Sequence, residues 1–326
     1  MDIHRRTFQR GLLAAALWPA TASWGQSNST RPVNWIVPWS AGGSADFAAR
    51  LIGTELGKQL NQSVVIENVA GGGGLVGYNK AAMAAGDGNT LYYGGTEMFV
   101  PAMTNPSITS DWTKQFKPVS LLLTNPFILV ARANAPYNNL DDFTEFARRN
   151  PGRVTYGSPG IATGQHLVGE MMRDKGRIAL VHVPYRGGAQ IVNDVLGGFV
   201  ECAFLIGATA QPHLKSGALK AIAIAEPTRH PVFPDIPTFN EHKTYQGLTM
   251  SPFGAVMVPS ATPEAIVQKL SNTFQQVMRN DHVRAKLAES GARVQFVSYQ
   301  DMPAFLKAET AKYKQVVEFA KVKVTS

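Results

Sequence analysis

The sequence is poor in cysteine, in long apolar runs and in clustered metal ligands. Its one cysteine, Cys202, rules out an internal disulfide and lies in an apolar context that favours a buried thiol. No segment after the N-terminus approaches the ~18 consecutive apolar residues of a membrane helix. The seven histidines stand apart, without an H-x-x-x-H spacing or a calcium loop. We therefore expect a protein without disulfides, resident metal or cofactor.

Blocks of like charge are also missing. The 31 Lys and Arg residues against 23 Asp and Glu give a net charge of +8, and the basic residues are scattered along the chain. Scattered charges are typical of a solvated surface rather than of a nucleic-acid-binding stripe, while a positive field favours anionic ligands. We expect a small anionic partner and no nucleic acid.

The N-terminal segment 1–26 has the order of zones found in export signals. Arg5, Arg6 and Arg10 come first, the apolar run 11–17 follows, and small residues come last. The run from Arg5 to Phe8 also resembles a twin-arginine signal, so general secretion and twin-arginine export both stay open. Export without a disulfide indicates the bacterial periplasm.

After the signal, short β-branched runs alternate with helical patterns. The predicted strands are 33–39, 64–67, 90–95, 118–124, 127–133, 154–158, 178–185, 200–206, 219–225 and 293–298. The predicted helices are 47–60, 78–85, 141–150, 163–175, 189–196, 281–290, 300–320 and one that begins at Thr262-Pro263-Glu264, with Thr262 as the cap.

This alternation predicts an α/β fold with mixed, mostly parallel sheets covered on both faces. Roughly 300 residues suffice for two lobes. We assign residues 27–130 plus 251–326 to lobe 1 and 131–250 to lobe 2, so the chain crosses between lobes twice and its tail packs on lobe 1.

Two strand–glycine–helix turns are the best candidates for an anion site. The first lies within PWSAGGSADF (38–47) and the second within YGSPGIATGQH (156–166). A helix N-terminus has unsatisfied N–H groups and a partial positive charge, which suit a carboxylate or phosphate. In a third turn, Arg186 precedes a helix and could meet a carboxylate through its forked donors, or simply be exposed.

Two enzyme interpretations compete with binding. Gly72, Gly74 and Gly77 have the G-x-G-x-x-G spacing of dinucleotide loops, and Glu97 follows 20 residues later. However, three residues separate the strand from the glycines, and the helix after them is short, which disfavours a dinucleotide unit. Ser158 could be a hydrolase nucleophile with His166 or His182 and Asp194, but position 156 is Tyr, so the G-x-S-x-G elbow is missing.

Taken together, five segments resemble the periplasmic solute-binding proteins of tripartite tricarboxylate transporters, the Bug receptors. They are IVPWSAGGSADFAARL (36–51), VVIENVAGGGGLVG (64–77), YGSPGIATGQHL (156–167), HVPYRGGAQ (182–190) and PDIPTFNE (234–241). The resemblance runs in order from about Arg31 to the C-terminus. It implies a periplasmic-binding-protein fold of type II, in which two α/β lobes close on a small ligand, usually a carboxylate, in a cleft between them.

The resemblance also implies a set of ligand-binding positions without a nucleophile–base pair, hence binding without catalysis. They are Trp39, Ser40, Ala41, Gly42, Gly43, Ser44, Asp46, Ser158, Pro159, Gly160, Thr163, His166, Tyr185, Arg186 and Gly187. Ala45 stands where the family commonly has Thr, and Trp39 where Phe is usual, which leaves the ligand's identity open. The implied partners are a small organic carboxylate and a membrane transporter component or a sensor, and we expect a monomer.

Overall fold

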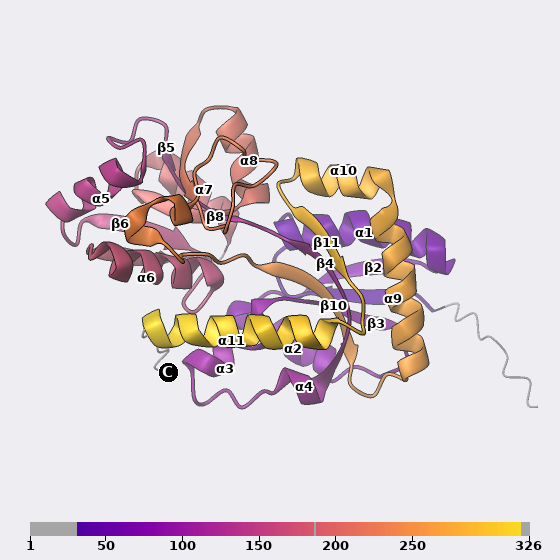
Figure 1. The fold of residues 1–326 in the computed structure, drawn as a ribbon. Coiled ribbons are helices and arrows are strands. Elements are labelled where there is room, and N and C mark those ends of the chain that lie inside the picture. Colours follow the sequence, from indigo (N-terminus) through magenta and orange to yellow (C-terminus); the bar gives the residue numbers. More distant parts are fainter. Residues whose placement is uncertain (1–30, 186, 321–326) are drawn as a thin grey trace, which may run out of the picture. The chain divides into compact units, whose positions relative to one another are not determined.

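The strands of the chain form two separate sheets (Figure 1). A computed structural model describes residues 31–185 and 187–320, so the predicted signal 1–26 and Arg186 lie outside the described residues. The first sheet contains β1 Val33–Val37, β2 Val64–Asn68, β3 Thr90–Gly94, β4 Phe116–Thr124, β10 Phe253–Pro259 and β11 Arg293–Val297, in the order β11-β4-β10-β3-β1-β2. The second contains β5 Phe127–Arg132, β6 Val154–Ser158, β7 Leu180–Pro184, β8 Cys202–Ile206 and β9 Leu219–Ile224, in the order β7-β6-β8-β5-β9.

Helices connect the strands and flank the sheets. The α-helices are α1 Ser44–Leu60, α2 Leu75–Ala82, α3 Val100–Thr104, α4 Trp112–Gln115, α5 Leu140–Arg149, α6 Gly164–Gly176, α7 Gly188–Gly197, α8 Gly207–Lys215, α9 Glu264–Arg279, α10 Asp281–Glu289 and α11 Met302–Ala320. The short 3-10 turns are η1 Gly72–Gly74, η2 Thr96–Met98, η3 Phe239–Glu241 and η4 Lys243–Tyr245. Two α/β lobes with mixed sheets are thus confirmed.

The direction of strand pairing differs from the prediction. Strand β1 pairs in parallel with β2 and β3, and β6 pairs in parallel with β7 and β8. The pairs β10–β3, β10–β4, β11–β4, β5–β8 and β5–β9 are antiparallel. Antiparallel pairs therefore outnumber parallel ones in the described chain, and "mostly parallel" was wrong. A continuous apolar run indicates burial on both faces, but it does not show which way the strand points.

The boundary between the sheets falls earlier than the predicted lobe boundary at residue 130. Strand β5 pairs along its length with β8 and β9, so all of Phe127–Arg132 belongs to the second sheet. The first sheet's preceding strand, β4, ends at Thr124. Strand β10 and the helices α3, α4 and α8 had not been predicted. The assignment of the remaining residues to two lobes stays a prediction.

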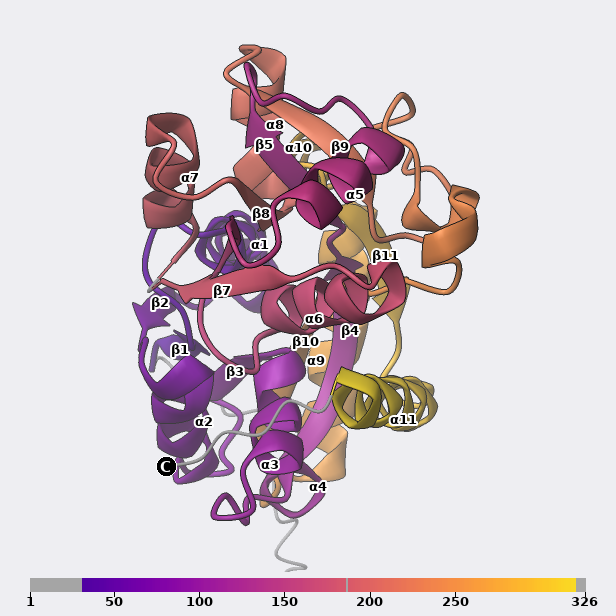
Figure 2. The same ribbon diagram turned by 90° about the vertical axis from the view of Figure 1, so that its left-hand side faces the viewer.

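The two crossing segments and the last helix join the sheets. The Asn125 amide, just after β4, donates to the Pro252 carbonyl, just before β10, at 2.8 Å. Helix α9 packs on α1 and β4 of the first sheet, as expected of the tail. Helix α11, however, contacts both α3 and α6, and it lies beside them in two views (Figures 1 and 2). The Tyr313 ring of α11 meets Phe99 edge-on at 5.5 Å between centroids. The tail therefore packs on α3 and α6, helices that the prediction assigns to different lobes.

Helix α1 shows how the apolar pattern becomes core. Ala48, Ala49, Ile52 and Leu56 are buried in one cluster with Trp35 of β1, whose ring contacts Phe274 of α9. Phe47, the first apolar residue of the predicted helix 47–60, is 41% exposed. Helix α1 thus packs by its alanines, Ile52 and Leu56, and exposes Phe47 in its first turn.

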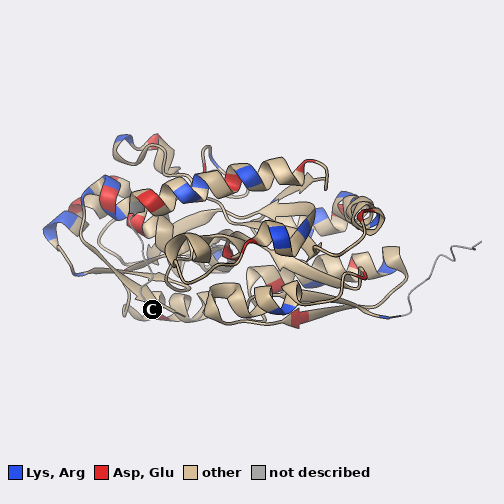
Figure 3. Ribbon diagram, turned by 90° about the horizontal axis from the view of Figure 1, so that it is seen from below, with Lys and Arg blue, Asp and Glu red and all other residues tan. Residues whose placement is uncertain are grey.

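Surface charge is interspersed, as expected. In Figure 3, Lys and Arg alternate with Asp and Glu along the helices of the face in view. None of the helices in residues 31–185 and 187–320 combines the length and apolar character that crossing a bilayer requires.

Candidate functional site

The first predicted turn joins β1 to α1 and has an uncapped helix end. Gly42 has a φ of 82°, in the left-handed region that favours glycine. Gly43 is the N-cap residue, with φ −80° and ψ 171°, and no side chain caps the first-turn amides. Ser40, Ala41 and Gly42 are exposed, whereas Trp39, Gly43 and Ser44 are half-buried. The turn therefore presents unsatisfied N–H groups near the surface.

Asp46 braces this turn from inside the helix. Its Oδ2 accepts the Gly42 amide hydrogen at 2.9 Å, and its Oδ1 forms an ion pair with Arg50 Nε at 2.9 Å. Burial raises the pKa of Asp46, but hydrogen bonds from Arg50, Gly42 and Asn68 outweigh it and hold that pKa below its usual value. A carboxylate at the first turn also complements the helix dipole. Asp46 thus uses its oxygens inside the protein, as a support for the turn.

Two residues that the sequence analysis missed complete this support. Asn68, at the end of β2, donates from Nδ2 to the Trp39 carbonyl at 3.1 Å and accepts from Arg50 Nη2 at 3.0 Å. The Asp46–Arg50 pair could have been found from its i, i+4 spacing on a helix. The contact of Asn68 with Trp39 spans 29 residues and has no local signal.

The second predicted turn, between β6 and α6, directs its hydroxyls inward. Ser158 Oγ lies 3.0 Å from the Gly160 carbonyl oxygen and accepts the Gly160 amide hydrogen at 3.2 Å. Thr163 is the N-cap residue of α6, but its hydroxyl donates to the Gly160 carbonyl at 2.8 Å and not to the helix. Helix α6 therefore also begins without a side-chain cap. Pro159 is half-buried, and Ile161 is 54% exposed at the tip of the turn.

A stacked pair of histidines lies behind this turn. The His166 and His182 rings stand 4.1 Å apart, centroid to centroid. His166 Nδ1 accepts the Ala162 amide hydrogen at 3.1 Å, and His182 Nε2 lies 2.6 Å from Ser158 Oγ. Burial, the other histidine and Arg173 lower the pKa of His166 to about 3, and burial lowers that of His182 to about 4. Both imidazoles are therefore neutral at neutral pH.

The expectation that the site lacks a nucleophile–base pair needs correction, because Ser158 and His182 lie within hydrogen-bonding distance of each other. Yet Ser158 is fully buried. Asp194, the predicted third member, instead accepts the Tyr185 hydroxyl hydrogen at 2.6 Å. A hydrolase needs an accessible serine and an acid that orients the histidine. The pair therefore has the distance of a catalytic dyad without its access or its acid.

The third predicted turn follows β7 and adjoins the second one. The Tyr185 amide donates to the Ser158 carbonyl at 2.8 Å, so these two turns are hydrogen-bonded neighbours. Gly187 is the N-cap residue of α7, again without a side-chain cap. The structure thus brings together Ser158, Gly160, Thr163, His166 and Tyr185, whereas Arg186 lies outside the described residues.

The glycine-rich segment of the dinucleotide interpretation serves close packing. A Cβ on Gly77 would lie 2.9 Å from Pro38 Cα, and one on Gly74 would lie 2.8 Å from Glu97 Cγ. The four glycines 71–74 all have positive φ and form a tight turn before α2. This turn therefore sits directly against Pro38, at the start of the first predicted turn.

Glu97 is not placed for ribose recognition. It is 4% exposed, and its Oε1 accepts from the Tyr92 hydroxyl and the Gly95 amide, both at 2.7 Å. Burial raises its pKa to about 7. Helix α2 has only eight residues, whereas a dinucleotide unit runs a long helix from its glycine turn. The spacing match therefore lacks its structural context.

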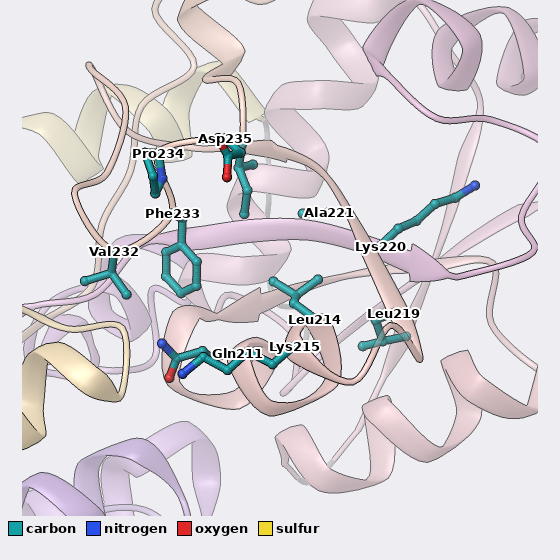
Figure 4. Close-up of a pocket in the computed structure, with 11 residues that line it drawn as sticks. Gln211, Leu214, Lys215, Leu219, Lys220, Ala221, Val232, Phe233, Pro234 and Asp235 are labelled. Atoms are coloured by element: carbon teal, nitrogen blue, oxygen red, sulfur yellow. The ribbon is translucent and has the colours of Figure 1, made fainter.

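A cavity of about 450 Å³ lies elsewhere, between α8, β9 and segment 232–236 (Figure 4). Phe233, Leu214 and Leu219 contribute apolar side chains, and Lys220 points away. None of the predicted ligand residues lines it. In the described part of the chain, no group of three His, Cys, Asp or Glu side chains could hold a metal ion. The cleft between the lobes stays a prediction.

Comparison with known proteins gives a consistent result. Residues 48–322 match the family described as "Tripartite tricarboxylate transporter family receptor". The periplasmic binding protein BugD is 27% identical with a TM-score of 0.83, and the alignment covers 90% of this chain and 98% of BugD. An R. palustris protein solved with adipate is 28% identical (TM-score 0.86; 90% and 99% covered). MatC from Rhodopseudomonas palustris, with bound malate, is 28% identical (TM-score 0.82; 89% and 99% covered).

Matches of this length, over both lobes, establish more than a shared architecture. The matched family is one of binding proteins and not of enzymes, which agrees with the buried Ser158 and the internally paired Glu97. The chain therefore belongs to the receptor family of the tripartite tricarboxylate transporters, the family of BugD.

Proposed function

We propose that the protein is an extracytoplasmic receptor that binds a small carboxylate-bearing organic acid between its two lobes. The observation that carries the proposal is a repeated one. Strand β1 in the first sheet and strand β6 in the second sheet each end in a glycine turn. Each turn leads into a helix without a side-chain cap. Each such helix end offers free N–H groups and about half a positive charge.

In this proposal the first-turn amides of α1 hold a ligand carboxylate, and those of α6 hold its other polar end. Asp46 and Asn68 keep the first turn in shape, while Ser158 and Thr163 shape the second. Trp39 and Tyr185 flank the ligand. Backbone N–H groups bind the carboxylate group and do not contact the rest of the acid. Selectivity among acids therefore depends on the flanking side chains. The adipate and malate of the two related structures support a carboxylate as the ligand class.

Location and partners follow from the same proposal. Residues 1–26 act as the export signal, the mature protein is a periplasmic monomer, and it delivers its ligand to a membrane transporter component or a sensor. BugD, described as a periplasmic binding protein, supports the location. N-terminal sequencing of the protein from a periplasmic extract tests the signal, and an N-terminus that retains residues 1–26 would contradict it.

A thermal-shift screen tests the ligand class directly. Adipate, malate and other mono- and dicarboxylates are added to the purified protein, with the matching amides as controls. At a concentration of 100 times Kd, a ligand of the native state stabilises it by about 2.7 kcal/mol. Calorimetry on each positive acid then gives Kd. If no acid changes the melting temperature, while a nucleotide does, the proposal is wrong.

Substitutions at Gly43 test where the carboxylate binds. An Asp or Asn at this N-cap position can cap the first-turn amides with its own side-chain oxygen, which stabilises a helix by roughly a few tenths of a kcal/mol relative to Gly. Gly43→Asp and Gly43→Asn should therefore raise the melting temperature slightly and weaken acid binding, Asp more strongly because of its charge. The position accepts a side chain, since its φ is −80° and a Cβ would lie 3.4 Å from the Ser40 carbonyl oxygen.

Gly43→Ala is the matched control, because it adds a Cβ without a capping group. It should lose far less affinity than either capping variant. Equal losses in all three variants would show that bulk at position 43, and not competition for the amides, weakens binding. Unchanged affinity in a folded Gly43→Asp variant would place the carboxylate elsewhere.

A further inference from the structure

We infer that His166 is a positioning residue, which holds the turn 160–163 in its binding shape by accepting the Ala162 amide hydrogen and does not itself touch the ligand. The inference rests on the proposed function, because it takes this turn as part of the ligand site. It reassigns His166, which the resemblance to the Bug receptors placed among the ligand-binding positions.

Ala162 gives the first reason. Its φ of 62° lies in the left-handed region, which L-residues other than Gly, Asn and Asp rarely adopt because the Cβ crowds the following carbonyl. Gly160, two residues earlier, also has a positive φ, of 139°. The turn therefore contains an unfavourable alanine conformation that the surrounding structure must hold in place. The hydrogen bond from the Ala162 amide to His166 Nδ1, at 3.1 Å, holds this conformation in place, and His166 lies four residues further along the chain, in α6.

The protonation state of His166 suits this role. A ring nitrogen that accepts the Ala162 hydrogen carries no proton, so the proton of the neutral ring is on Nε2. Nε2 points toward Glu170, with 3.9 Å between it and Oε1. The groups that face the ring are His182, stacked at 4.1 Å, Tyr156, and Glu170, which is itself paired with Arg173 at 2.6 Å. Burial lowers the pKa of His166 to about 3, so Nδ1 is an unprotonated acceptor at neutral pH.

His182 braces the other end of the same turn. Ser158 Oγ has one hydrogen, and the Gly160 carbonyl accepts it at 3.0 Å. His182 Nε2, 2.6 Å from that oxygen, then donates its own hydrogen to it. The stacked histidines thus support Gly160 through Ser158 and Ala162 directly. Since His166 is 7% exposed and both its ring nitrogens face protein groups, it acts through the backbone.

Three variants separate positioning from direct contact. His166→Phe keeps a ring for stacking but removes the acceptor. His166→Asn retains an acceptor oxygen near the place of Nδ1. In the double variant His166→Phe/Ala162→Gly, glycine adopts the left-handed conformation without a supporting bond. Circular dichroism establishes that each variant is folded, and calorimetry with the best acid from the thermal-shift screen gives its Kd.

We expect His166→Phe to raise Kd about tenfold, equivalent to 1.4 kcal/mol. His166→Asn should stay within about threefold of the wild type. The double variant should recover most of the tenfold loss. If His166 contacts the ligand, glycine at 162 cannot restore the affinity, so a double variant as weak as His166→Phe overturns the inference. An unchanged Kd in His166→Phe overturns it as well.

Hydrogen exchange at the Ala162 amide tests the inference without a ligand. Exchange should be slow in the wild type and in His166→Asn, and at least tenfold faster in His166→Phe. Equal exchange rates in the three proteins overturn the inference. If the wild type binds no carboxylic acid at all, the proposed function fails, while the exchange rates still decide whether His166 holds the turn.

Discussion

Glu97 offers a test of how strongly burial raises a carboxyl pKa in this fold and thereby lowers stability at neutral pH. Its carboxyl group is almost fully buried, and one oxygen accepts hydrogen bonds from the Tyr92 hydroxyl and the Gly95 amide. Burial raises the pKa values of Tyr93, Tyr78 and Tyr313, and the negative charge on Glu97 raises them further. The substitution Glu97→Gln keeps an acceptor oxygen for Tyr92 and Gly95 and removes the ability to ionise.

The magnitude follows from the pKa of Glu97, which burial raises from 4.5 to about 7. Below pH 4.5 the group is protonated in both the folded and the unfolded chain, so it imposes no penalty. Between pH 4.5 and 7 the unfolded chain releases this proton and the folded protein keeps it, so stability falls as pH rises. The gap of about 2.5 pH units, at 1.36 kcal/mol each, gives a loss of about 3 kcal/mol that persists above pH 7.

Urea unfolding at pH 4.5 and pH 8 measures this loss. Glu97→Gln should match the wild type at pH 4.5, apart from a constant offset, and gain about 3 kcal/mol relative to it by pH 8. The buried histidines titrate alike in both proteins and cancel in the difference. Glu318→Gln, at an exposed position of α11, should show no such pH dependence. A Glu97→Gln difference that is the same at both pH values would refute the reasoning.

Two further predictions concern a buried base and a close approach. Burial and Arg293 lower the pKa of His230 from 6.5 to about 4, so its neutral form stabilises the fold at neutral pH, and that stability is lost as pH falls from 6.5 toward 4. His230→Asn should weaken this acid-induced loss by up to about 3 kcal/mol. The free energy of unfolding is measured with urea at several pH values between 6.5 and 4, and an equal pH dependence in both proteins would contradict the prediction. Gly77→Ala should destabilise by about 1–3 kcal/mol, because its Cβ would lie 2.8 Å from the Val69 carbonyl oxygen. Gly73→Ala, with open space but a φ of 64°, should cost only about 1 kcal/mol, and a larger loss in Gly73→Ala than in Gly77→Ala would refute the packing argument.

Local pattern was a good guide to individual elements. Strand β6, Val154–Ser158, has the predicted bounds, and α1 was predicted to within three residues. Strand β10 was missed although it reads FGAVMVP, because it follows a long irregular segment and its place between β3 and β4 depends on partners more than 100 residues away. Pairing direction could not be predicted for the same reason, since it is decided by where the chain crosses between sheets.

The start of α9 shows tertiary packing overriding a local signal. Thr262 was predicted as the cap with Pro263 in the first helical position, but Pro263 is the N-cap residue and the helix begins at Glu264. Thr262 is buried, and its carbonyl accepts a hydrogen bond from Lys117 Nζ at 2.7 Å. A Cβ on Gly86 would lie 2.7 Å from the Thr262 amide nitrogen. A neighbouring loop and strand thus determine the position of Thr262, one residue too early for it to cap.

In the candidate site too, local sequence predicted the turns but not the direction of their side chains. Glycines and hydroxyls before a helical pattern predicted both turns, because left-handed backbone and helix starts have compositional signals. The resemblance to the Bug receptors placed Ser158 and Thr163 among the ligand-binding positions, and in the structure both hydroxyls contact the Gly160 carbonyl. The Ser158 hydroxyl also contacts His182 Nε2, which lies on β7, 24 residues further along the chain. A polar side chain in such a turn therefore has two uses, to hold the turn or to hold a ligand, and its partners in the folded chain decide between them. In the second predicted turn the Ser158 and Thr163 side chains hold the backbone, and under the proposed function the helix amides bind the ligand.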